Sequence, residues 1–315
     1  MTTTLSNTEA KANRRYQLIG FAFAIIGSAL FSFRPILVKF AYQEQLDSVT
    51  LLALRMLFSA PFYIVLLCIF MRNPKRREPL NTSIVLQAGL IGFMGYYVSS
   101  LVDLIGLQYI SAQLERMLLF TYPTLVVIFG ALFFRRKITG NTLLALAFSY
   151  CGIAFIFTHD LKYYGDDIVK GSFFVCLSSL IFAFYVLFGK QIINKIGSRL
   201  FTCIAMISAS IGIMVHFFIT NDISDLHTST RIYFICFAIA IFCTILPSFF
   251  ISEAIARIGP DRNSIVGTIG PVFTTLFAVS LLDEAFTHYH VLGMLLVIIG
   301  VSVLGYKKST RQPRV

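Results

Sequence analysis

The chain has 315 residues, of which 57% are hydrophobic and only 13% are charged, and its mean hydropathy is +0.79. Soluble domains carry about 25% charged residues, so this composition excludes a soluble globular protein and indicates an integral membrane protein. The net charge of +11 would suit a nucleic-acid-binding protein, but the distribution of the charges indicates a different cause.

The apolar residues form separate runs of about 17 to 25 residues, the length at which a helix spans the hydrocarbon core of a bilayer. A transmembrane β-barrel would show alternating segments of about ten residues instead. The first run follows 16 mostly polar residues without a short hydrophobic region or a cleavage motif, so a cleaved signal peptide is not expected. We therefore expect an all-α integral membrane protein. Ten transmembrane helices are predicted at residues 17–40, 48–71, 83–107, 111–134, 141–158, 170–190, 199–219, 231–255, 262–282 and 288–306.

Lysine and arginine are distributed unevenly among the links between these helices. If the N-terminus is cytoplasmic, the cytoplasmic segments contain 19 of them and the outer segments contain four. The outer links carry most of the acidic residues, among them Asp160 and Glu284. Positive residues near membrane spans are retained on the cytoplasmic side. We therefore expect a multi-pass protein of the plasma membrane (the inner membrane of a bacterium), with both termini in the cytoplasm and no nucleic-acid partner.

Two stretches of the chain match each other at a fixed distance. Residues Ile110–Thr139 correspond to Ile258–Thr287, 148 positions later, and this shift places Pro123 on Pro271. The first copy ends in three basic residues, whereas the second has two acidic residues near the matching end. Because each half has five helices, an odd number, the second half must enter the membrane upside down, which explains the opposite charges. We predict two inverted-topology five-helix repeats, at residues 17–158 and 170–306.

Two segments resemble the EamA type of the drug/metabolite transporter superfamily, namely LERMLLFTYPTLVVIFGALFFRRKIT and LLDEAFTHYHVLGMLLVIIGVSVLGY. The resemblance covers nearly the whole chain. It implies a secondary transporter, and members of the family move amino acids, related metabolites and drugs. Two features depart from the family pattern. The glutamate that usually precedes the threonine survives as Glu284 but is Arg136 in the first copy, and the Trp-Gly of the first helix is missing from a chain without Trp.

A proline lies near the middle of the fourth and of the ninth predicted helix. Proline has no N–H and displaces the carbonyl four residues earlier from the helical ladder, which frees the carbonyls of Leu119 and Gly267. Such breaks are tolerated where other groups or cavity water bond the carbonyls. Because both copies have the proline, we favour a hinge or a cavity wall at Pro123 and Pro271 over a simple packing kink.

Six charged residues lie inside predicted spans, where charges are costly and usually face a pathway or one another. Glu253 lies near the cytoplasmic end of its helix. The other five come from four helices and lie toward the outer side: Arg34, Arg55, Asp103, Glu115 and Arg116. One interpretation is an ion-pair network that holds these helices together or closes an outer gate. The other is that three arginines against two acids attract an anionic or carboxylate-bearing substrate, with Asp103, Glu115 or Glu253 as a proton-coupling site.

Small and polar residues recur on one face of the third and of the ninth predicted helix. Such a face suits either close helix packing or a cavity wall, and both interpretations stay open. Tyr185 takes the place in the second half that Arg34 has in the first. The full set of candidate cavity residues is Arg34, Arg55, Tyr96, Asp103, Glu115, Arg116, Tyr122, Tyr185, Asn263 and Thr274.

Other chemical motifs are weak or missing. His288 and His290 lie with Asp283 and Glu284 in an outer loop, where solvated side chains are a better interpretation than a metal site. No P-loop, HExxH or GxSxG motif occurs in the sequence, so we expect no cofactor, no metal and no enzyme activity. We expect a secondary transporter that moves a small metabolite by alternating access; an intramembrane enzyme or a non-transporting receptor is the alternative. The expected partners are a small-molecule substrate and the lipid bilayer, and a homodimer stays open.

Overall fold

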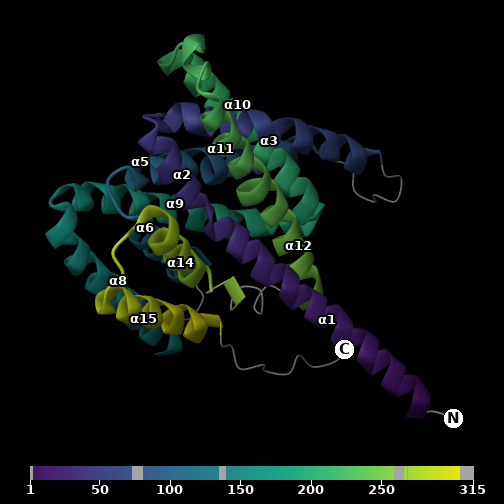
Figure 1. The fold of residues 1–315 in the computed structure, drawn as a ribbon. Helices are drawn as coiled ribbons and strands as arrows, with labels where there is room; N and C mark the ends of the chain where they lie inside the picture. The colour runs from purple at the N-terminus through teal and green to yellow at the C-terminus, as the bar shows by residue number, and fades with distance from the viewer. Residues whose placement is uncertain (1–2, 73–80, 135–139, 259–265, 268, 306–315) are drawn as a thin grey trace.

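The computed structural model describes residues 3–72, 81–134, 140–258, 266–267 and 269–305. In this part of the chain every regular element is helical and no strand occurs (Figure 1). The first half contains α1 (Thr3–Ser32), α2 (Arg34–Gln43), α3 (Ser48–Met71), α4 (Thr82–Gly92), the π-helical turn η1 (Phe93–Val98), α5 (Ser99–Leu107), α6 (Ala112–Leu119), α7 (Tyr122–Phe134) and α8 (Gly140–Tyr164). The second half contains α9 (Asp167–Ile196), α10 (Ser198–Thr220), the 3₁₀ turn η2 (Ile223–Leu226), α11 (Thr230–Ala240), the π-helical turn η3 (Ile241–Ile245), α12 (Leu246–Ile258), α14 (Gly270–Leu282) and α15 (His288–Gly305).

These helices have the length and composition of membrane spans. Over the described ranges, seven helical segments are long and apolar enough to cross a membrane, and Gly270–Leu282 and His288–Gly300 are shorter apolar helices. Large apolar side chains such as Leu132, Ile219 and Phe234 are 70%, 77% and 70% exposed, which suits side chains in contact with lipid. The prediction of an all-helical protein with several membrane spans is therefore confirmed, while the count of ten spans stays a prediction.

The fifth predicted helix is longer than expected. α8 continues past the predicted end at residue 158 and ends at Tyr164. His159 and Asp160 therefore lie inside a helix, and both side chains are buried. The expectation that Asp160 lies in an outer loop was wrong, because the polar end of a helix keeps its backbone hydrogen bonds after the apolar pattern stops.

Two spans are broken next to the prolines that the repeat pairs. Pro123 lies in the first turn of α7, directly after the end of α6, and Pro271 lies in the first turn of α14. The freed carbonyl of Leu119 accepts a hydrogen bond from Ser179 Oγ at 3.4 Å, so a neighbouring helix satisfies it as a broken span requires. In the described residues a helix thus begins next to each of the two prolines, and the use of these positions as hinges stays a prediction.

Two π-helical turns interrupt long helices at matching places. η1 begins at Phe93 and η3 begins at Ile241, which is 148 positions later. The same shift relates the two proline-containing stretches and makes Thr244 the equivalent of Tyr96. A π-helical turn within an α-helix frequently marks a functional site.

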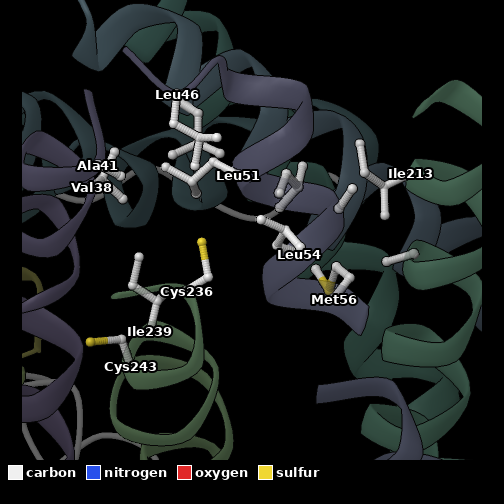
Figure 2. Close-up of a cluster of buried hydrophobic side chains, with 14 of the residues drawn as sticks. Val38, Ala41, Leu46, Leu51, Leu54, Met56, Ile213, Cys236, Ile239 and Cys243 are labelled. Carbon is white, nitrogen blue, oxygen red and sulfur yellow. The ribbon is translucent and has the colours of Figure 1, made fainter. Parts of the chain in front are cut away.

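The largest apolar core joins α2 and α3 of the first half to α10 and α11 of the second (Figure 2). Val38, Leu51 and Ile239 are fully buried in it. Cys236 and Cys243 lie in the same cluster as free thiols and pack as small apolar residues. Lipid is as apolar as these side chains, so close van der Waals packing, rather than removal from water, holds the helices together.

α8 and α15 lie side by side (Figure 1) and approach closely at two glycines. A Cβ atom added to Gly152 would lie 2.4 Å from the carbonyl oxygen of Gly293, and one added to Gly293 would lie 2.6 Å from the carbonyl oxygen of Gly152. No side chain fits at these distances without moving a backbone. The two glycines therefore set the separation of the last helices of the two halves.

Gly152→Ala should destabilise the protein by about 1–3 kcal/mol, because the new methyl group forces α8 and α15 apart. Gly140→Ala is the matched control, since a Cβ there has no neighbour within 4 Å. The midpoint of thermal unfolding in detergent, followed by size-exclusion chromatography, measures both. Equal midpoints for the two variants would contradict the close approach.

Candidate functional site

The five charged residues that the sequence places toward the outer side meet in the structure. They are buried to between 1% and 6% exposure and come from α2, α3, α5 and α6. Arg34 Nη2 donates to Asp103 Oδ2 at 2.6 Å. Glu115 interacts electrostatically with both of these residues, and Arg55 lies within electrostatic range of Arg34. We call this group the charged cluster: Arg34, Arg55, Asp103, Glu115 and Arg116.

A helix break that the sequence pattern did not predict lies beside Arg34 and Arg116 of the charged cluster. Pro35 lies in the first turn of α2 and cannot bond the carbonyl four residues earlier, which is that of Phe31. Arg116 Nη2 donates to this carbonyl at 3.2 Å, and the Arg116 guanidinium also lies over the Phe31 ring, 5.1 Å from its centroid. The Ser32 carbonyl accepts from Thr274 Oγ1 at 3.0 Å. A proline directly after an intramembrane arginine was the available signal for this break.

Several polar atoms of the charged cluster have no hydrogen-bond partner among the described residues. Arg55 Nε donates to Thr244 Oγ1 at 3.1 Å, but its Nη1 is unpartnered. Arg116 Nε and Nη1 are also unpartnered, and the nearest carboxylate oxygen to Nε, Glu115 Oε2, is 3.9 Å away. On the acidic side, Asp103 Oδ1 and Glu115 Oε2 lack partners. Because a buried unpaired charged group is costly, these atoms are available to water or to a polar ligand.

Tyr96 and Thr244, the equivalent residues of the two π-helical turns, both interact with Arg55. Thr244 accepts its hydrogen bond, and the Tyr96 hydroxyl lies within electrostatic range of the guanidinium. Thr244 was not among the predicted residues, although applying the repeat shift to Tyr96 would have identified it. The two turns thus bring one residue from each half to the same arginine.

The remaining tyrosine candidates, Tyr185 of α9 and Tyr122 of α7, lie in one aromatic group. Tyr185 donates to the Tyr96 hydroxyl at 3.2 Å, which connects this group to η1. Tyr122 packs edge-to-face on Phe182 with ring centroids 5.0 Å apart. Tyr122 therefore lies beside aromatic rings, whereas Tyr96 joins the aromatic group to the charged cluster. Asn263 lies outside the described residues.

Glu253 belongs to a separate salt-bridge group. Its carboxylate accepts from Arg199 Nη2 and, at 3.2 Å, from Arg257 Nη2.

Arg199 also lines a small pocket between α3, α10 and α12. Tyr63 lies at this pocket, where its hydroxyl is 3.3 Å from Ser248 Oγ, and it also interacts electrostatically with Arg55. The pocket is lined by Tyr63, Leu66, Phe70, Arg199, Thr202, Cys203, Ser248 and Phe249.

Glu284 connects the second half to the start of α6. Its carboxylate accepts from the backbone N–H of Ala112 at 2.7 Å and of Gln113 at 3.3 Å. A carboxylate at a helix N-terminus is favoured by the helix dipole. Burial raises the pKa of the Glu284 carboxyl, and the two amide hydrogen bonds oppose this shift. Glu284, a residue of the second half, therefore caps the N-terminus of α6. The sequence predicts a solvated side chain at this position instead.

His290 is also not solvated as expected. Its side chain is 3% exposed and packs against α8. Glu284 bonds α6, while His288 is exposed. The loop set that the sequence analysis considered as a weak metal site is therefore not assembled. His290 lies instead beside His159 and Asp160 of α8.

Arg34→Gln or Asp103→Asn should each destabilise the protein by about 3–5 kcal/mol, because each leaves the partner charge buried and unpaired. The double variant should lose less than the sum of the single losses, by more than about 1 kcal/mol. Equilibrium unfolding of all four proteins in mixed micelles measures this coupling. Additive losses would mean that the two side chains are not paired.

Glu284→Ala should speed hydrogen–deuterium exchange at the Ala112 and Gln113 amides by about tenfold or more, since each loses a charge-assisted hydrogen bond. Asp283→Asn is the control, because Asp283 is exposed and asparagine tolerates its left-handed backbone, with φ of 53°. Mass spectrometry of a peptide that contains Ala112 and Gln113 in its interior measures the exchange. Unchanged protection in the alanine variant would show that Glu284 does not close the helix.

The chain is similar to known transporters along most of its length. A family model described as the EamA-like transporter family matches it twice, at residues 18–158 and 169–306. The uncharacterized transporter YcbK of Bacillus subtilis (strain 168) is 26% identical over 306 residues, covering 95% of this chain and 97% of the relative. An uncharacterized transporter of Haemophilus influenzae is 22% identical over 271 residues, and the match covers 84% of this chain and 85% of that relative.

A solved crystal structure has the same fold. It is 15% identical to this chain, with a TM-score of 0.62, and the match covers 92% of this chain and 96% of that one. At this identity the likeness concerns the fold alone. The two matches of the family model account for most of the sequence, so the chain belongs to the EamA-like transporter family and is a multi-pass membrane protein.

Proposed function

We propose that the protein is a secondary transporter that moves a small anionic metabolite, such as an amino acid or another carboxylate, across the plasma membrane by alternating access. The observation that carries this proposal is the set of unpartnered guanidinium nitrogens in the charged cluster, Nη1 of Arg55 and Nε and Nη1 of Arg116. Guanidinium groups bind carboxylates through strong, charge-assisted hydrogen bonds. Three arginines against two acids leave the cluster with a formal excess of one positive charge.

The proposal includes ten spans arranged as two inverted five-helix repeats. The two matches of the family model support this arrangement. The paired prolines and the two π-helical turns, in each case 148 positions apart, support it too. Inverted repeats place a substrate site at their interface near the middle of the membrane. The interactions of Arg55 with one residue from each π-helical turn support a site at this interface. The uneven distribution of Lys and Arg supports cytoplasmic termini.

Asp103 and Glu115 are the proposed proton-coupling residues. Both carboxylates are buried and each has an oxygen without a partner. A proton or a cationic group of the substrate would supply the missing partner. Glu253 already bonds two arginines, so it is a weaker choice for this role.

A panel of radiolabelled metabolites, tested for uptake and export in cells with and without the protein, identifies the substrate, and a proton uncoupler tests coupling. With that substrate at subsaturating concentration, Arg55→Gln in proteoliposomes should lower the transport rate by about tenfold or more. The reason is that the variant loses one charge-assisted hydrogen bond to the substrate, which contributes about 1.5–3 kcal/mol. Arg34→Ala and Arg116→Ala should also lose transport.

Arg231→Gln is the control, because Arg231 is 65% exposed and pairs with Glu44 away from the charged cluster. Folding of each variant is checked by its elution in size-exclusion chromatography. Wild-type rates in all three cluster variants would refute an anion site at these arginines.

A further inference from the structure

Two histidines and an aspartate meet in a buried group between α8 and α15. His159, Asp160 and His290 are 8%, 2% and 3% exposed, and one potential ligand atom of each lies within 4.8 Å of the other two. We propose that these three residues bind a transition-metal ion, Zn²⁺ or an ion of similar chemistry, which joins the last helix of the first half to the last helix of the second.

Two of the three distances between the ligand atoms fit a tetrahedral site, and the third is within 4.8 Å. His159 Nδ1 lies 3.2 Å and His290 Nε2 lies 3.3 Å from the same oxygen, Asp160 Oδ1. Zinc bonds of about 2.0–2.1 Å in a tetrahedron place neighbouring ligand atoms roughly 3.3 Å apart. An ion can therefore occupy the space between the three atoms with small side-chain movements. Water or another small ligand would fill the fourth position.

Neighbouring residues orient these ligands as outer-shell partners do in known metal sites. Ser111 Oγ donates to Asp160 Oδ2 at 3.0 Å, which leaves Oδ1 directed at the two histidines. Thr287 Oγ1 and Thr287 N lie 2.9 Å and 3.4 Å from His290 Nδ1, so Nε2 is the nitrogen that faces the aspartate. Metal binding at Nε2 requires the proton of the neutral ring on Nδ1, where Thr287 Oγ1 can accept it. Each of these contacts turns a ligand atom toward the same point.

The fold brings the ligands together through the glycine approach of α8 and α15. Gly152 and Gly293 bring the two backbones into contact, and His290 lies in the first turn of α15. The His159 and His290 rings pack edge-to-face with centroids 5.0 Å apart. A bound ion would therefore join the two helices close to this glycine contact.

The donor set selects the kind of ion. Two imidazole nitrogens and one carboxylate oxygen suit Zn²⁺ and related transition metals, whereas Ca²⁺ and Mg²⁺ prefer shells made of oxygen. The competing arrangement has no ion: Asp160 accepts hydrogen bonds from both rings and from Ser111. This hydrogen-bonded group and the metal site differ in measurable ways.

The test uses full-length protein purified in detergent with a tag that contains no histidine. After treatment with chelator and dialysis, the protein is incubated with Zn²⁺, and bound metal is measured by mass spectrometry. About one Zn²⁺ per chain is expected for the wild type. Asp160→Asn, which keeps the side-chain shape, and His290→Gln, which removes the imidazole, should lose it. His288→Gln should retain it, because His288 is exposed and outside the group.

Co²⁺ provides a measurement on the wild type that does not depend on whether a variant folds. Tetrahedral binding gives intense visible absorption, which Zn²⁺ should abolish by competition. Thr287→Val should weaken Zn²⁺ binding by about 10–100-fold. A wild type that binds no more Zn²⁺ than His290→Gln, or Co²⁺ that stays weakly absorbing and octahedral, would overturn the metal site in favour of the hydrogen-bonded group. Transport has no part in these measurements, so the result is independent of the proposed substrate site.

Discussion

The arrangement of the first half depends on the hydrogen bond between Arg116 and the Phe31 carbonyl. Pro35 removes the partner of that carbonyl inside a membrane span, and an unsatisfied backbone group in hydrocarbon costs several kcal/mol. A guanidinium group satisfies it at 3.2 Å. The contact also explains why the charge of Arg116 is tolerated inside the membrane. The Phe31 carbonyl and the Phe31 ring replace part of the water that the guanidinium loses on burial. The break and the charged cluster therefore stabilise each other.

The second half supplies hydroxyl groups where the first supplies charges. Thr274 bonds the Ser32 carbonyl, and Thr244 bonds Arg55. Hydroxyl groups can donate and accept, and their desolvation costs less than that of a charged group, so they can support the charged cluster without adding charge to it. If both halves carried arginines, the cluster would hold like charges at close range in a medium that screens them poorly. The asymmetry between the halves thus leaves one net positive charge near their interface.

The sequence predicts those features that depend on local pattern or on the repeat. The apolar runs give the helices, and the paired prolines Pro123 and Pro271 give two of the breaks. Intramembrane charge identifies the five residues of the charged cluster, because such charges must find one another. Contacts between distant segments are harder to predict. Nothing local indicates that Glu284 reaches the amides of α6, or that His290 meets Asp160, since both contacts depend on how the last helices pack. The predicted end of α8 was wrong because hydropathy indicates where the apolar segment ends, whereas the helix continues as far as its backbone hydrogen bonds do.

α6 connects these separate features. It has only eight residues, and its N-terminus is held by Glu284 through two amides and by Asp160 through Ser111. One turn later it carries Glu115 and Arg116, and the break next to Pro123 separates it from α7. If so short a segment moves as one unit in the proposed transport cycle, a shift that brings Arg116 to a substrate strains or releases its N-terminal contacts. Each contact to a charged group contributes about 1.5–3 kcal/mol. A ligand can drive that shift only if it binds the shifted state more tightly by a similar amount, and a carboxylate on unpartnered guanidinium nitrogens has the chemistry to provide it.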